Sequence, residues 1–240
     1  MQLFFSENIN NNIIILDKIE SNHCLKVLRY RVGDDICSVD GKGNYYEGII
    51  SSIENKICYI KIKNVIKNFD KKSHYIHIAI SLLKNQDRLE WFIEKSVEIG
   101  VDEITFINCT RTLRKKNRME RILRISKSAM KQTLKATLPK INSVVSYSDF
   151  IKNLKINNKF ICHLEHEIPN DIFYYKKDIL EDKKICILIG PEGDFSIKEV
   201  EDAYNKGIKP LNLGKSRLRT ETAGIVACHL SNLILSSNEQ

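Results

Sequence analysis

Two glycine-rich turns near the carboxyl end of the chain have the residue types of a ligand-binding site. They read ILIGPEGDFS and LNLGKSRLRTETAG, and both lie within residues 185–224. Each follows an apolar run typical of a strand and opens onto a segment with helical spacing. Glycine lets backbone approach a ligand or take a positive φ, and helix N-termini offer unpaired N–H groups. We therefore predict both turns at the carboxyl ends of strands, where open α/β sheets bind small molecules.

Several common chemistries are excluded by spacing. The string Leu213-Gly-Lys-Ser216 resembles the end of a phosphate-binding P-loop, but Lys209 stands where its first glycine is required. His163 and His166 have no third ligand at a zinc-like spacing, so we expect surface or loop roles for them and no metal site. The hydrolase pattern GxSxG and the dinucleotide pattern GxGxxG are both missing.

Composition indicates an ordinary globular protein. The chain has 240 residues, 42% hydrophobic and 28% charged, which is enough to bury a core. It has neither an 18-residue apolar run nor the features of a signal peptide, so no membrane association is expected. Seven scattered cysteines without a CxxC pair predict reduced, mostly buried thiols in the cytoplasm.

The net charge of +8 is concentrated in one segment. Residues 1–70 carry nine basic and nine acidic side chains, whereas residues 111–140 carry eleven basic side chains against the single Glu120. A one-sided basic helix is typical of a polyanion-binding surface, although a solvated helix face is the alternative. The core side of this helix is predicted to hold Met119, Ile122, Leu123, Met130 and Leu134, and the basic side Arg114, Arg118, Arg121, Arg124, Lys127, Lys131 and Lys135.

The elements fall into two groups along the chain. Residues 2–66 contain short strand-like runs separated by turn signals, with one short helix over Asn22–Arg29, which predicts a small β-barrel. The polar segment Asn64–Ser73 is the predicted linker. From His74 onward strands alternate with helices, which favours a mainly parallel sheet in an α/β domain.

Particular helix and strand ends can be placed in this second group. A buried strand is predicted over 75–81 and an amphipathic helix over Arg88–Ile99, ended by Gly100, with Trp91 packed inside. Ser196 and Glu199 fit a capping box that opens another helix. The last helix, Thr222–Leu235, is apolar on nearly every side and must be buried in the domain or against a second subunit.

The motifs resemble those of the bacterial 16S rRNA (uracil-N3)-methyltransferases, a branch of the SPOUT superfamily. The most specific part is the combination of GPEGDF at 190–195, Leu213-Gly214 and RLRTETA at 217–223. Weaker matches extend over nearly the whole chain: His23, Val27-Leu-Arg29, Gly33, Lys84, Glu90, Lys95, Glu98-Ile-Gly100 and Arg111.

The resemblance implies a fold and a function. Residues 1–70 would form a PUA-like β-barrel that helps hold RNA, and residues 71–240 a SPOUT-type α/β methyltransferase domain with a C-terminal trefoil knot. Topological rules alone would reject the knot. The family implies a homodimer, S-adenosylmethionine as methyl donor, and methylation at N3 of one uridine in 16S rRNA of the 30S subunit. Two alternatives remain open: a non-catalytic ribosome-assembly factor, and a knotted ribose 2′-O-methyltransferase.

Site residues follow from the same match. Glu221 is the candidate base or proton-path residue and Arg219 the candidate that stabilises the uracil anion; the alternatives are a helix-terminal charge and a phosphate contact. Thr220 or Thr222 could instead be an N-cap, and Asp194 part of a plain turn. Predicted cofactor contacts are Ile189, Gly190, Glu192, Gly193, Leu213, Gly214, Leu218, Thr220 and Thr222.

The RNA-binding residues are less regular than the cofactor turns. The family arginine after Leu213-Gly214 is displaced to Arg217, so either Arg217 or Lys215 replaces its contact. A family motif close to EQSxR appears as KQTLK at 131–135. Predicted RNA contacts are His23, Arg29, Lys84, Arg111, Arg114, Arg118, Lys131 and Arg217.

Overall fold

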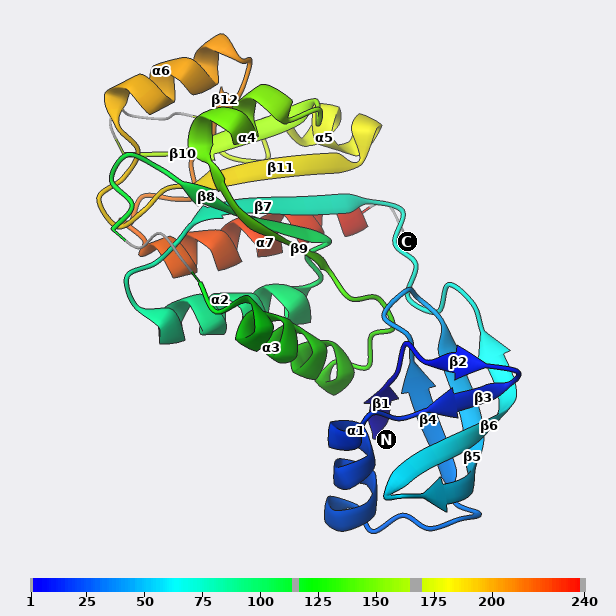
Figure 1. Ribbon diagram of the computed structural model, residues 1–240. Coiled ribbons are helices and arrows are strands. Elements are labelled where there is room, and N and C mark those ends of the chain that lie inside the picture. Colours follow the sequence, from blue (N-terminus) through cyan, green and yellow to red (C-terminus); the bar gives the residue numbers. More distant parts are fainter. Residues whose placement is uncertain (1, 114–116, 165–169, 238–240) are drawn as a thin grey trace. The chain divides into compact units, whose positions relative to one another are not determined.

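A computed structural model describes residues 2–113, 117–164 and 170–237. Its contacts divide the chain into two compact units: Met1–Lys71 with Lys127–Leu138, and Lys72–Ser126 with Pro139–Gln240 (Figure 1). Helix α3 (Met119–Gln132) therefore contributes to both units. The sequence-based division at residue 70 assigns the whole of α3 to the second.

The first unit is built on a six-stranded sheet. Its hairpin between β5 and β6 turns at Asn55 and Lys56, which both have positive φ (50° and 66°), as the two-residue turns that match strand twist require. The sheet is antiparallel apart from the β1–β4 pair. Its order is β1 (Leu3–Phe5), β4 (Asp35–Val39), β5 (Tyr45–Glu54), β6 (Ile57–Ile66), β3 (Ile13–Ile15) and β2 (Ile9–Asn10).

This sheet curves into a half-barrel. The Ser6 hydroxyl, just beyond β1, donates to the Ile15 carbonyl of β3 at 2.6 Å, which brings strands from opposite sides of the sheet order together. The helix predicted over Asn22–Arg29 starts earlier, because Asp17 caps α1 (Lys18–Asn22), which continues into the π-helical turn η1 (His23–Val27). The core between helix and sheet contains Phe4, Ile14, Leu16, Cys24, Ile36, Ile50, Cys58 and Ile60.

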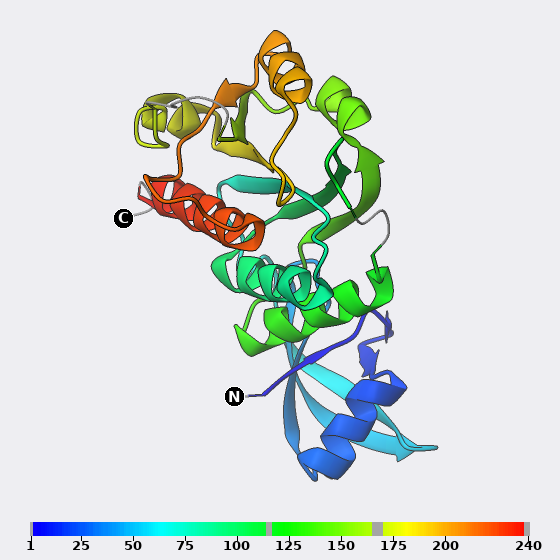
Figure 2. The ribbon, with the colours of Figure 1, turned by 90° about the vertical axis from the view of Figure 1, so that its left-hand side faces the viewer.

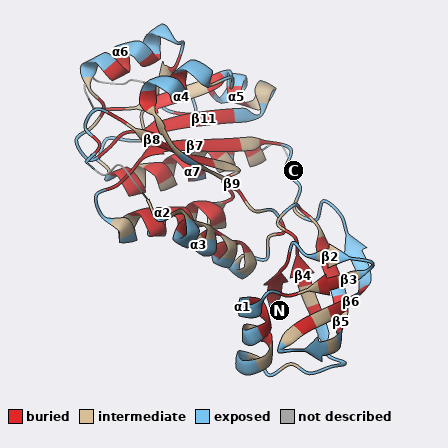
Figure 3. Ribbon diagram, viewed as in Figure 1, coloured by how far each residue is buried: buried red, intermediate tan, exposed pale blue. Residues whose placement is uncertain are grey.

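The second unit is an α/β domain with a fully parallel six-stranded sheet, as the alternating pattern predicts. The side chains of central β7 and β11 are almost all buried, because helices cover both faces (Figures 1 and 3). The order is β12 (Lys209–Pro210), β10 (Asn158–Cys162), β11 (Lys184–Ile189), β7 (Tyr75–Ser81), β8 (Glu103–Asn108) and β9 (Lys140–Ser146).

The helices of this unit confirm several predicted ends. Gly100 ends α2 with a φ of 111°, and Ser196 with Glu199 forms the capping box of α6. Figure 2 shows α7 and α2 on one side of the sheet and α4 and α6 on the other. The bounds are α2 (Gln86–Ile99), α4 (Tyr147–Asn153), α5 (Lys176–Asp182), α6 (Ile197–Asn205) and α7 (Thr220–Ser236).

Two apolar side chains do not lie where the sequence predicts. Trp91 is 46% exposed on α2, so its predicted packing is wrong; the core face of this helix instead holds Leu89, Phe92 and Ile93. Leu134 is 41% exposed because α3 ends at Gln132 and Leu134 takes a left-handed φ of 56°. The prediction for both residues used helical spacing relative to apolar neighbours. Spacing alone does not show where the buried face of a helix ends.

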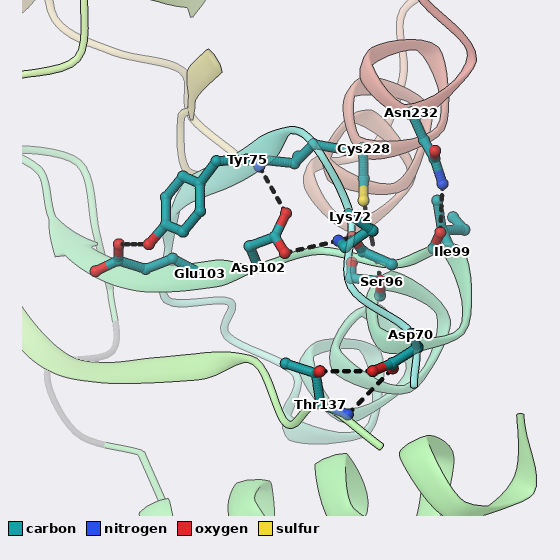
Figure 4. Close-up of polar contacts among 12 residues, drawn as sticks. Asp70, Lys72, Tyr75, Ser96, Ile99, Asp102, Glu103, Thr137, Cys228 and Asn232 are labelled. Carbon is teal, nitrogen blue, oxygen red and sulfur yellow. Dashed lines mark hydrogen bonds and ion pairs between the residues drawn. The ribbon is translucent and has the colours of Figure 1, made fainter. Parts of the chain in front are cut away.

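Helices α2 and α7 pack closely through one glycine. A Cβ on Gly224 would lie 2.5 Å from the ring of Phe92 and 3.2 Å from Ile80. Polar contacts fix the other end of the pair: the Asn232 amide donates to the Ile99 carbonyl at 2.5 Å (Figure 4). The Cys228 thiol donates to the Ser96 carbonyl at 4.0 Å in the same interface.

A polar cluster joins the beginnings of β7, β8 and β9. The Tyr75 hydroxyl donates to the Glu103 carboxylate, as Figure 4 shows. Lys72 forms an ion pair with Asp102, with 2.7 Å between Nζ and Oδ1. Burial of Glu103 acts to raise its pKa. The hydrogen bond from Tyr75, with the other polar contacts of the carboxylate, outweighs burial and lowers the pKa to about 2. His77 bonds Thr105 at 2.8 Å, and burial lowers its pKa to about 4.

We predict that Gly224→Ala destabilises the protein even though alanine is the better helix former. The added methyl group must displace the Phe92 ring, and overpacking of this kind costs about 1–3 kcal/mol. Urea unfolding measures the loss. Gly193→Ala is the control, because its Cβ would meet Arg111 at an ordinary 3.5 Å. Equal stability of the two variants would contradict this packing.

The buried His77 predicts a loss of stability in mild acid. Its pKa is about 4 in the folded chain and 6.5 when free, so the unfolded chain takes up the proton first as pH falls. Lowering the pH from 7 to 4.5 should remove roughly 2–3 kcal/mol of unfolding free energy through this residue. His77→Gln should abolish that part of the pH dependence, and exposed His229→Gln should retain it. Identical pH profiles for both variants would refute the assignment.

Candidate active site

The carboxyl ends of three adjacent strands converge on one pocket in the second unit. Because β10, β11 and β12 are parallel and paired, the segments after them leave the same edge of the sheet. The pocket has a volume of about 890 Å³. It is lined by Arg88, Cys162, His163, Leu164, Ile189, Gly190, Pro191, Glu192, Asp194, Leu211, Asn212, Leu213, Gly214, Lys215, Ser216, Arg217, Leu218, Arg219, Thr220 and Ala223.

The first glycine-rich turn is held rigidly at the end of β11. A Cβ on Gly190 would lie 3.0 Å from the Phe195 ring and 3.2 Å from its backbone nitrogen, so the chain needs glycine there. Asp194, with a φ of 62°, accepts from Phe195 N–H and from Leu164 N–H, both at 2.8 Å. Its carboxylate thus ties the turn to the segment after β10, a role beyond the plain turn considered from sequence. Glu192 accepts from Lys84 N–H at 3.0 Å.

The second turn leads directly into α7. The Asn212 side chain accepts from Gly214 N–H at 2.8 Å, and Gly214 has a φ of 121°, which favours glycine. Arg219 is the N-cap of α7 but makes no side-chain cap hydrogen bond, so the suggestion that Thr220 or Thr222 caps the helix is wrong. The first N–H groups of α7 therefore lack a side-chain cap, and Thr220 and Ala223 beside them line the pocket.

Cations predominate among the charged groups of the pocket. Arg88, Lys215, Arg217 and Arg219 line it, against the carboxylates of Glu192 and Asp194 and no other charged side chain of the described residues. Both candidates for the displaced family contact, Lys215 and Arg217, therefore face the pocket. Such a site suits a ligand that carries or develops negative charge.

Glu221 does not line the pocket. It is only 5% exposed, its Oε1 lies 3.6 Å from Arg88 Nε, and its Oε2 is buried without a hydrogen-bond partner in the part of the chain described. Its ion-pair partner Arg88 lines the pocket, so the carboxylate lies just behind the pocket wall. Nothing in the sequence pointed to this pairing, since the two residues are far apart along the chain.

Most predicted cofactor residues come together in this pocket. Ile189, Gly190, Glu192, Leu213, Gly214, Leu218 and Thr220 line it, as does Arg219, whereas Gly193 and Thr222 do not. Cys162 and Leu164 were missed, although the carboxyl-end rule for parallel strands could have included the segment after β10. His163 was expected at the surface or in a loop; it lies in the loop after β10, where its side chain is buried and bonds the Tyr204 hydroxyl at 2.6 Å. His166 lies outside the described residues.

The predicted RNA-binding residues of the second unit differ in whether their side chains are exposed and without a described internal role. Lys84, Arg118 and Arg217 are exposed. Arg111 is exposed as well, but its Nη1 donates to the carbonyls of Gly193 and Phe195 at 2.8 and 3.1 Å, so it holds the first turn. Arg114 lies outside the described residues.

In the first unit, Arg29 is exposed with a φ of 58°, and His23 is partly buried beside the Phe4 ring. Lys131 forms an ion pair with Glu20 in which both side chains are largely buried. Glu20 also accepts from Phe5 N–H at 3.2 Å. This internal partner gives Lys131 a packing role, and its predicted RNA contact stays a prediction.

The described residues contain neither a metal-binding cluster nor a membrane-spanning helix. They contain no group of three or more His, Cys, Asp or Glu side chains arranged to hold a metal ion. Every helix among them is too short or too polar to cross a lipid bilayer.

Comparison with known proteins agrees with this architecture. Residues 70–232 match an RNA methyltransferase domain family, and residues 16–63 match an RNA methyltransferase PUA domain. A ribosomal RNA small subunit methyltransferase E from Buchnera aphidicola is 30% identical, over 94% of this chain and 90% of that protein. A second one, from Rickettsia conorii, is 28% identical over 97% of this chain and 96% of that protein.

Solved structures show the same fold. The crystal structure of a probable rRNA methyltransferase from Porphyromonas gingivalis is 37% identical, with a TM-score of 0.89 over 98% of this chain and 99% of that one. The ribosomal RNA small subunit methyltransferase E from Neisseria gonorrhoeae, bound to S-adenosyl methionine, is 26% identical, with a TM-score of 0.83 over 96% of both chains. The chain thus belongs to the ribosomal RNA small subunit methyltransferase E family, with a PUA domain and an RNA methyltransferase domain.

Proposed function

We propose that this protein uses S-adenosylmethionine to methylate N3 of one uridine in 16S rRNA of the 30S subunit. One observation carries the proposal: two rigid glycine-rich turns and the open N-terminus of α7 surround a pocket of about 890 Å³ at the end of a parallel sheet. That volume is within the range of small-molecule sites. The Neisseria relative bound to S-adenosyl methionine supports this donor.

The residues of the pocket suit a methyl transfer to a uracil anion. Bound S-adenosylmethionine supplies a methyl group on a positively charged sulfur, which a nucleophile displaces directly. Glu192 and Asp194 can offset that positive charge, and the backbone at Ile189, Leu213 and Leu218 can contact the adenine. Arg219 can stabilise the uracil anion or hold an adjacent phosphate. Most of the rate enhancement then comes from alignment of the reacting atoms.

The remaining features are consistent with an RNA substrate. Exposed Arg118 and Arg124 on α3, with Arg217 at the pocket, offer cations to phosphate groups. We propose residues 1–70 as the RNA-holding PUA-like domain and residues 71–240 as the catalytic domain, which would contain the trefoil knot that the sequence resemblance implies. A homodimer is supported by Leu233, an apolar side chain on α7 that is 52% exposed. The seven cysteines form no disulfide among the described residues, which suits a cytoplasmic protein.

The role of the first turn can be tested by binding alone. Asp194→Ala removes both hydrogen bonds that tie this turn to Phe195 and Leu164, so the affinity for S-adenosylmethionine should fall about tenfold. Isothermal titration calorimetry measures it. Asp202→Ala, on the exposed face of α6, should leave it unchanged. Equal affinities for both variants would contradict the assigned role of this turn.

The reaction itself is tested with radiolabelled S-adenosylmethionine and 30S subunits that lack the modification, or naked 16S rRNA. The proposal predicts label at one uridine, with arrest of reverse transcription there, because N3 methylation blocks the Watson–Crick edge. A 2′-O-methyl product would instead protect the adjacent phosphodiester from alkali. Donor binding without transfer to either RNA would exclude 16S rRNA as the substrate, and failure to bind the donor would favour the assembly-factor alternative.

A further inference from the structure

Arg88 is the one pocket-lining residue of the described chain that comes from neither glycine-rich turn, nor α7, nor the end of β10 and the segment after it. It lies in the first turn of α2, and its side chain is 40% exposed. The two turns and the start of α7 supply the predicted cofactor contacts, so Arg88 adds a cation to the pocket from an element outside that set. This separate origin makes Arg88 the candidate for a contact with the second substrate.

A buried carboxylate restrains this arginine through an ion pair that is longer than a hydrogen bond. Glu221 Oε1 lies 3.6 Å from Arg88 Nε, and the carboxylate is 94% covered. An ion that is buried without compensation is costly, so Glu221 requires a nearby cation. The contact through Nε leaves the two terminal nitrogens of the guanidinium available for a further acceptor. Arg219, by contrast, makes no ion pair with any described residue, so its direction is not restrained in this way.

We propose that Arg88 is the cation that stabilises the uracil anion, and that Glu221 is its positioning residue rather than the general base. The assignment rests on the proposed function. The N3 proton leaves to water, the negative charge spreads onto the ring carbonyl oxygens, and Arg88 donates to one of them. The N3–carbon bond then forms as the sulfur–carbon bond breaks, which leaves a neutral thioether. Arginine suits the task because it stays protonated throughout.

Single-turnover methyl transfer at saturating S-adenosylmethionine tests whether Arg88 stabilises the uracil anion. Arg88→Met should slow transfer about 100-fold or more, as loss of one anion-stabilising donor does, with Arg88→Lys partly restoring it. The affinity for S-adenosylmethionine should change less than twofold. Lys95→Met is the matched control, since Lys95 is an ion-paired cation on the same helix outside the pocket. A weaker donor affinity with an unchanged rate would overturn the proposal and make Arg88 a cofactor ligand.

The roles of Glu221 as base and as positioning residue separate in a double-mutant cycle. If Glu221 acts through Arg88, Glu221→Gln should slow transfer in the wild-type background but add nothing to Arg88→Met. The rate should still rise with pH in Glu221→Gln, because water takes the proton. A further loss in the double variant, or a flat pH profile in Glu221→Gln, would show that Glu221 is the base.

The positioning of Arg88 by Glu221 can be measured without RNA. Nitrogen-15 relaxation of the Arg88 Nε–H group should show an ordered side chain in the wild type and a mobile one in Glu221→Gln, with Arg121 Nε, bound to Glu90 at 2.6 Å, unchanged in both. Equal mobility of Arg88 in the two proteins would overturn the positioning role. This result stands whether or not 16S rRNA is the substrate, so the two proposals can fail separately.

Discussion

The parallel pairing of β10, β11 and β12 is the constraint on which the site depends. Antiparallel neighbours would send successive loops to opposite edges of the sheet, whereas parallel register delivers the segments after all three strands to one edge. Both glycine-rich turns and the buried His163 meet there. Because central β11 is buried on both faces, helices must cover it, and the pairing is therefore stabilised by the core of the unit.

Helix α7 connects this core to the pocket. Its second turn packs on α2 at Gly224, where the chain has no room for a side chain, while its uncapped first turn borders the pocket. Glu221 and Arg88 are the first-turn residues of these two helices, so the same packing that stabilises the fold restrains the guanidinium. Stability and the electrostatics of the site are thus coupled through one helix pair.

Much of this arrangement could be predicted from sequence, and the exceptions have physical reasons. Local signals predicted the parallel strands, the Ser196–Glu199 capping box and the positions of Gly190 and Gly214, because each depends on a few neighbouring residues. Strand β9 was missed because it is a half-buried edge strand without a clear apolar pattern. The exposure of Trp91 and the pairing of Arg88 with Glu221 depend on how helices pack, which periodicity does not specify. The polar composition of Asn64–Ser73 predicted the domain boundary, whereas the knot rests on resemblance alone.

The central claim is that the two glycine-rich turns form the donor site. Amide hydrogen exchange with and without S-adenosylmethionine tests it directly, because exchange reports where the ligand orders the backbone. The account predicts protection of residues 189–195 and 211–223, and no change at the second, smaller pocket beside Asn108 and Ser146. Protection centred on that smaller pocket, or none at saturating ligand, would contradict it.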